Sequence, residues 1–147
     1  METNKDQTNM QTLQGKLCVA LYEKLGDMVL PVIKKTYGEY GFEVGTGLKK
    51  KWKPNNLIAA GEAFIDMTNK AGLPSRIEMR DGMAYWTGYR CPFGIENTYG
   101  KVCEALMEMD RHIFCALLGV ERDRLEFTIQ KSLAVGDDCC QGIVRLL

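Results

Sequence analysis

Residues 76–90, RIEMRDGMAYWTGYR, alternate polar and apolar side chains on either side of an Asp-Gly pair. An alternation of period two predicts strands with one buried face, and Asp-Gly between two such runs is typical of a tight hairpin turn. Tyr85, Trp86 and Tyr89 are residue types that favour a pleated surface. Cys91-Pro92 ends the return strand, since proline cannot donate to the ladder. The stretch therefore predicts a β-hairpin in the middle of the chain.

Three helices are expected before this hairpin. The first carries an apolar stripe at three- and four-residue steps, formed by Leu13, Leu17, Ala20, Leu21 and Leu25. The second begins near Asp27 and ends at Gly38 and Gly41, with an inner face of Val32, Ile33, Tyr37 and Tyr40. The glycine-rich residues 41–47 are expected to form a turn. A third helix runs from about Leu57 to Ala71, because Gly72 and Pro74 are typical of a helix end.

After the hairpin, the pattern predicts one long helix over 98–118 and a second pair of strands, 124–134 and 139–147, joined by the turn Gly136-Asp137-Asp138. The order indicates an α+β fold with N-terminal helices, a β-hairpin, a long helix and a second β-hairpin. Its expected core is a four-stranded antiparallel sheet packed by helices. Residues 10–147 are expected to form a single domain after a disordered N-terminus, residues 1–9.

Composition narrows the function classes. The 147 residues are 46% hydrophobic and 26% charged, with a formal net charge of zero, so no long-range field favours nucleic acid or a membrane surface. The basic run Lys49–Lys53 is interpreted as a solvated helix end rather than a nucleic-acid site. The polar N-terminus lacks the apolar core of a signal peptide, and the protein is expected to be cytoplasmic. A homodimer through the amphipathic first helix is a possibility that the pattern leaves open.

Cysteines supply the candidate chemistry. There are six, Cys18, Cys91, Cys103, Cys115, Cys139 and Cys140, expected to be reduced thiols because no export signal is present. Cys91 stands where a strand meets a loop, a common place for functional residues. Cys103 and Asp110 are seven residues apart on one helix face. Cys139 and Cys140 are adjacent in a strand and must face opposite sides.

Three segments together resemble the L-2-amino-thiazoline-4-carboxylic acid hydrolase family: Cys91-Pro92-Phe93, the acidic helix Met107-Glu108-Met109-Asp110, and Gly136-Asp137-Asp138-Cys139-Cys140. The segment 20–26 is similar to that family's first helix, so the resemblance covers about residues 13–147. The fold also resembles the vinyl-reductase-type (4VR) small-molecule-binding domains. The chain departs from the family pattern at two places. Many relatives carry a cysteine a few residues before the helix aspartate, where this chain has Met107 or Glu108. They carry a phenylalanine after the cysteine of the last strand, where this chain has Gly142.

The resemblance implies hydrolytic opening of a cyclic amidine ring, with Cys91 or Cys140 as nucleophile and Asp110 moving protons. Arg90 or Arg111 would pair with a substrate carboxylate. An alternative is that Cys91, Cys103 and Cys140 hold a metal such as zinc or iron. A further alternative is a non-catalytic small-molecule-binding or sensing module, its pocket between sheet and helices. That pocket would be lined by Tyr85, Trp86, Phe93 and Met107.

Overall fold

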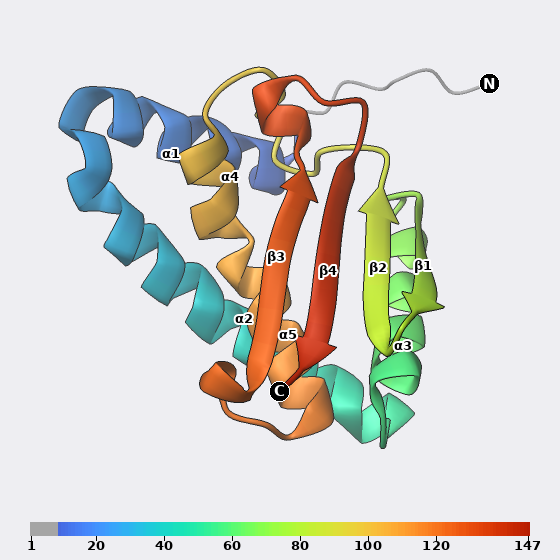
Figure 1. The fold of residues 1–147 in the computed structure, drawn as a ribbon. Helices are drawn as coiled ribbons and strands as arrows, with labels where there is room; N and C mark the ends of the chain where they lie inside the picture. The colour runs from blue at the N-terminus through green and yellow to red at the C-terminus, as the bar shows by residue number, and fades with distance from the viewer. Residues whose placement is uncertain (1–8) are drawn as a thin grey trace.

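Three long helices come first along the chain, and all four strands follow them, as the sequence predicts (Figure 1). The computed structural model describes residues 9–147. Its helices are α1 (Met10–Leu25), α2 (Leu30–Trp52), α3 (Leu57–Lys70), α4 (Gly100–Leu106) and α5 (Glu108–Leu118), with short 3₁₀ helices at Gly26–Val29, Arg122–Arg124 and Leu133–Val135. Its strands are β1 (Ser75–Arg80), β2 (Met83–Gly88), β3 (Leu125–Lys131) and β4 (Cys140–Leu146). The expected disorder of residues 1–9 concerns residues 1–8, which lie outside the described residues, while Asn9 is the N-cap of α1.

The four strands form one antiparallel sheet in the order β1-β2-β4-β3, which confirms the predicted fold class. Asp81 and Gly82 both have positive φ, 52° and 77°, as a type I′ hairpin turn requires. β3 ends at Lys131, three residues before the predicted end, because Leu133–Val135 turns into a 3₁₀ helix. Both hairpins predicted from the sequence are therefore present, and β4 lies between β2 and β3.

Helices cover one face of the sheet, which lies in front of them in Figure 1. Phe64 of α3 packs edge-on against Trp86 of β2, and Phe114 of α5 packs against Phe127 of β3. Trp86 pairs with Gly142, and Ala84 pairs with Val144, so these residues share the covered face. Burial of this apolar surface is the main source of the domain's stability.

The expected end of the second helix is wrong. Instead of stopping at Gly38 and Gly41, α2 continues through residues 41–47 to Trp52. A Cβ at Gly41 would lie 2.1 Å from the carbonyl oxygen of Met109, and one at Gly45 would lie 2.6 Å from that of Ile113. The glycines let α2 approach the backbone of α5, and they do not break the helix. As interpreted from the sequence, Lys49–Lys51 occupy its last turn, where cations complement the helix dipole.

The predicted long helix over 98–118 is two helices. Met107 separates α4 from α5, with a backbone ψ of −7° in place of the helical value near −42°. The break lies just before Met109, whose carbonyl faces Gly41 of α2.

The apolar stripe of α1 faces outward. Its buried residues are small ones, Thr12, Gly15 and Cys18, while the leucines of the stripe are exposed. On α2, Ile33 is buried as expected, whereas Val32 and Tyr40 are exposed and do not belong to an inner face. Among the described residues, no helix combines the length and apolar character needed to cross a bilayer.

Candidate functional site

A cleft of about 430 Å³ opens between the edge strand β3 and helix α4. Cys103, Glu104 and Arg111 line it from the helical side, and Phe127 and Ile129 line it from the strand. The loop after β3 closes one end with Ser132 and Val135. The volume lies within the range of about 300–1,000 Å³ that is usual for small-molecule sites.

Three of the six thiols lie near one another beside this cleft. Ser132 Oγ is 3.2 Å from Cys103 Sγ, and the backbone N–H of Leu133 donates to Cys140 Sγ at 3.4 Å. Cys91 is buried in one hydrophobic cluster, and Cys103 and Leu133 pack against that cluster. Cys91, Cys103 and Cys140 come from a strand end, a helix and a second strand, and the fold brings these three segments together.

The thiols are poorly suited to act as nucleophiles. Burial raises the pKa of Cys91 and of Cys103, and raises that of Cys140 to about 12. A reactive thiolate needs the opposite direction. Among residues 9–147, no group of three or more His, Cys, Asp or Glu side chains has an arrangement that could hold a metal ion, and this covers the set Cys91, Cys103 and Cys140.

Asp110 is the second notable group. Its side chain is buried on α5, four residues before Phe114, so both point toward the covered face of the sheet. It also lies close enough to Cys103 to raise the pKa of that thiol. Burial alone raises the pKa of the Asp110 carboxyl to about 7, and the ion pairs within the described part of the chain do not include it. Asp110 does not line the cleft between β3 and α4.

Replacement of Asp110 by asparagine is expected to remove a pH-dependent instability. Because the folded-state pKa of about 7 exceeds the unfolded value near 3.9, the native state binds the proton more tightly. The contribution of Asp110 to stability is therefore highest below about pH 4, falls as the pH rises, and stops falling above about pH 7. Between pH 5 and pH 8 the wild type should lose about 2–3 kcal/mol more than Asp110→Asn in urea unfolding. Asp123→Asn, an exposed change, should behave like the wild type; equal slopes for wild type and Asp110→Asn would contradict the expectation.

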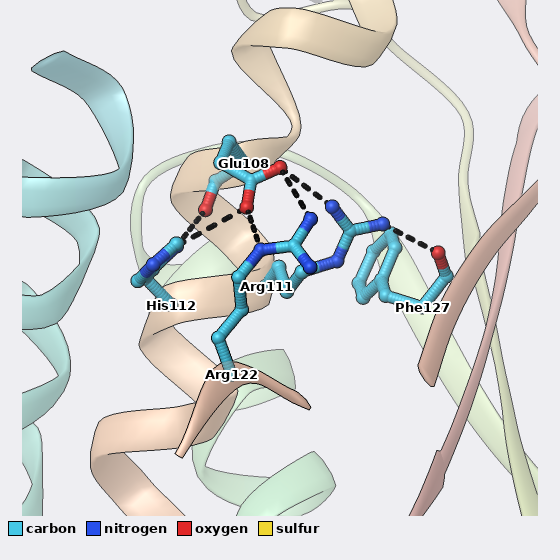
Figure 2. Close-up of polar contacts among 5 residues, drawn as sticks. All are labelled: Glu108, Arg111, His112, Arg122 and Phe127. Atoms are coloured by element: carbon cyan, nitrogen blue, oxygen red, sulfur yellow. Dashed lines mark hydrogen bonds and ion pairs between the residues drawn. The ribbon is translucent and has the colours of Figure 1, made fainter. Parts of the chain in front are cut away.

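Arg111 lies in the cleft wall but its guanidinium is already engaged (Figure 2). It donates to Glu108 Oε2 at 2.5 Å and to the carbonyl of Phe127 at 2.6 Å, and it lies over the Phe127 ring. Glu108 also accepts from Arg122 Nε at 2.6 Å. Arg111 therefore ties α5 to β3, which leaves it little capacity for a substrate carboxylate.

The remaining predicted binding residues are dispersed. Tyr85 and Trp86 are adjacent in β2 and face opposite sides; Arg80 stacks over the Tyr85 ring at 4.0 Å, while Trp86 lies in the core with its indole nitrogen unpartnered among the described residues. Phe93 packs edge-on against Tyr37. Arg90 is exposed, with a 3.4 Å contact to the carbonyl of Gly72. Met107 packs against the core at the break between α4 and α5.

Sequence reasoning missed two residues of this region. Ser132 contacts Cys103, and only the short distance from the end of β3 to Gly136 could have suggested it. Arg122 donates to Glu108, and no local sequence pattern suggests this contact. His112 also contacts the buried Glu108. His112 lines a separate hollow against α2, with Lys34, Gly38 and Phe42 among its neighbours.

Comparison with known proteins finds solved structures that share this fold. No family model and no curated protein matches the chain. The phenol-responsive sensory domain of the transcription activator PoxR, solved with phenol, matches with a TM-score of 0.63 at 13% identity, over 99% of this chain and 78% of that one. The chain shares its fold with a ligand sensor. A trafficking protein particle complex subunit 3 from Naegleria fowleri, covalently bound to palmitic acid, matches with a TM-score of 0.57 at 12% identity, over 92% of this chain and 96% of that one.

These likenesses concern the fold, since both identities are low. Both of these structures hold a small molecule, phenol in one and covalently bound palmitic acid in the other. Neither of the two proteins is described as a hydrolase, so the thiazoline hydrolase family receives no support from them.

Proposed function

We propose that this chain is a non-catalytic small-molecule-binding domain whose ligand enters the cleft between β3 and α4. The observation that carries the proposal is the cleft itself, with the Cys103 thiol in its wall. Its lining combines apolar side chains with polar ones, and a ligand pocket uses such polar groups to orient a small molecule. The shared fold with a phenol sensor supports the same assignment.

The walls favour a ligand that has both an apolar part and a polar group. Phe127, Ile129 and Val135 offer apolar contact. Polar and charged side chains of the same lining, among them Glu104, Thr128 and Lys131, offer hydrogen bonds. Phenol and palmitic acid, the molecules bound by the two structural relatives, both have this character and are suitable first probes.

Ligand binding is expected to raise the melting temperature. A ligand present at 100 times its Kd adds about 2.7 kcal/mol to the stability of the native state, which corresponds to roughly 5–10 °C for a domain of this size. We expect at least one compound in a series of phenols and fatty acids to produce such a shift in thermal unfolding. Glu104→Trp, at an exposed position on the rim, and Cys103→Phe, inside the cleft, should both abolish it.

The matched control is Ile58→Phe, an exposed apolar position on α3 that does not line the cleft. This variant should keep the full shift. A shift that persisted in both Glu104→Trp and Cys103→Phe would place binding elsewhere. A series in which no compound stabilises the wild type would overturn the proposal.

Ring-opening hydrolysis, the function implied by the sequence resemblance, is less well supported. The thiols of Cys91 and Cys140 have raised pKa values, and His112, the sole histidine of the chain, lines a different hollow. A thiol nucleophile usually depends on a neighbouring base or a lowered pKa. Hydrolysis of 2-amino-thiazoline-4-carboxylate by the wild type, lost separately in Cys91→Ala and Cys140→Ala, would restore the hydrolase interpretation.

A further inference from the structure

An apolar surface on α1 lacks a covering element in the described chain. We define the α1 face as Met10, Leu13, Leu17, Leu21 and Leu25, which are between 38% and 67% exposed. Met28, 70% exposed, continues it beyond the end of the helix. Scattered single apolar residues are normal on a protein surface, but a contiguous row of this kind marks an interaction site.

The outward orientation of the α1 face is fixed by the opposite side of the helix. A Cβ at Gly15 would lie 2.2 Å from the carbonyl oxygen of Phe93, so α1 approaches the loop after β2 with only a hydrogen between the backbones. Cys18 and Thr12 are buried beside that contact. Rotating α1 to bury its leucines would push large side chains into this narrow contact, so the leucines remain outside.

We infer that the α1 face is the interface of a two-fold symmetric homodimer, in which α1 packs antiparallel against α1 of a second copy. The leucines at 13, 17 and 21 are evenly spaced about Leu17. A two-fold axis through Leu17 places Leu13 of one copy against Leu21 of the other and Leu17 against itself. A self-complementary patch of this kind is what an isologous interface requires.

The size of the α1 face suits this partner. Six side chains exposed to this degree amount to roughly 500–600 Å² of apolar surface, which is about the apolar share of the ~800 Å² that each partner contributes to a standard interface. The exposed Ala20, one turn from Leu17, leaves room for close approach of a second helix. The leucines at 13, 17, 21 and 25 form a ridge of four-residue steps along the helix. Two such ridges that interlock are expected to make the helices cross at about 50°.

The charges on α1 do not favour a membrane as the occupant of the α1 face. In the antiparallel register, Lys24 of one copy lies near Met10 of the other, away from both lysines. Lys16 and Lys24 are balanced by Glu23 and Asp27, so the segment carries no net charge that would draw it to an anionic membrane.

Sedimentation equilibrium of the full chain tests the inference. The wild type should have a mass of about twice 16.6 kDa at micromolar concentration. Leu17→Asp changes the interface twice per dimer, and its dimer dissociation constant should rise by at least ~100-fold while the far-ultraviolet circular dichroism stays unchanged. Ile58→Asp, an equally drastic change at an exposed position on α3, should remain dimeric.

Cross-linking tests the position of the axis and does not depend on a disruptive variant. Leu17→Cys should form an intermolecular disulfide rapidly under mild oxidation, because the axis sets this position against its own copy, while Ile58→Cys should not. A monomeric wild type at 100 μM, a dimer that persists in Leu17→Asp, or a wild type that instead sediments with phosphatidylcholine–phosphatidylserine vesicles would overturn the inference. Each outcome is independent of whether the cleft binds a ligand.

Discussion

Replacement of Gly41 by alanine is expected to destabilise the protein by roughly 3–5 kcal/mol, although alanine is the better helix former. Gly41 lies within α2, and a Cβ there would be 2.1 Å from the carbonyl oxygen of Met109. Backbone atoms on both sides leave no flexible side chain to move aside. The methyl group would force α2 and α5 apart, and the loss of packing would extend along both helices.

Gly47 offers a matched control in the same helix. A Cβ at Gly47 would have no atom within 4 Å. Gly47→Ala should therefore stabilise the protein by about 0.5–1 kcal/mol through helix propensity. Thermal or urea unfolding of the two variants should give opposite signs for the same chemical change six residues apart. Equal effects at both positions would show that α2 and α5 do not make this contact.

Replacement of Glu108 by alanine is expected to cost about 3–5 kcal/mol, because it leaves the guanidinium of Arg111 buried without its carboxylate. The side chains of Glu108 and Arg111 are only 6% and 15% exposed, and Figure 2 shows the carboxylate held between Arg111, Arg122 and His112. Arg122 is half exposed and contributes less. Loss of the cluster should also loosen the cleft, since Arg111 joins α5 to the β3 carbonyl of Phe127.

The cluster has a defined pH range. Burial acts to raise the pKa of Glu108, but the hydrogen bond from Arg122 and the charges of Arg111 and Arg122 outweigh it, so the pKa lies below its usual range. A lowered folded-state pKa stabilises the protein above the unfolded value near 4.3, and this contribution is lost as the pH falls further. The difference between wild type and Glu108→Ala should thus be constant from pH 6 to pH 8 and shrink below about pH 4. Glu104→Ala, an exposed change one turn earlier, should alter stability by less than about 0.5 kcal/mol.

Local sequence patterns were sufficient to predict those elements whose formation does not depend on residues far away in the chain. Asp81-Gly82 predicted the hairpin because two consecutive residues with positive φ are favoured by this pair alone. Gly72 and Pro74 predicted the end of α3 because they act on the backbone directly. Leu125, Phe127 and Ile129 alternate with polar residues along β3, and this period of two marks its covered side. These elements were enough to predict the α+β class and a four-stranded antiparallel sheet.

The candidate site could be predicted only in part. Cys103 and Asp110 were placed on one face by helical spacing, and Cys140 was separated from Cys139 by strand alternation. Their approach to Cys91 and Ser132 depends on how β3 and α4 pack, which no spacing along the chain reveals. Arg111 was proposed from the sequence as a partner of a substrate carboxylate, whereas its role as a link to Glu108 and Phe127 follows from contacts across the fold.

The sequence by itself therefore determined the order of the elements, both hairpins and the fold class, because these follow from backbone preferences and from the period of the apolar residues. The tertiary structure decided whether a glycine ends a helix or allows a close contact, as at Gly41, since the answer depends on the backbone of α5. It also decided which side of α1 is buried. The periodicity of its leucines marks an apolar stripe but does not say whether the stripe packs on the same chain or remains exposed, and the contact of Gly15 with Phe93 fixes it outside.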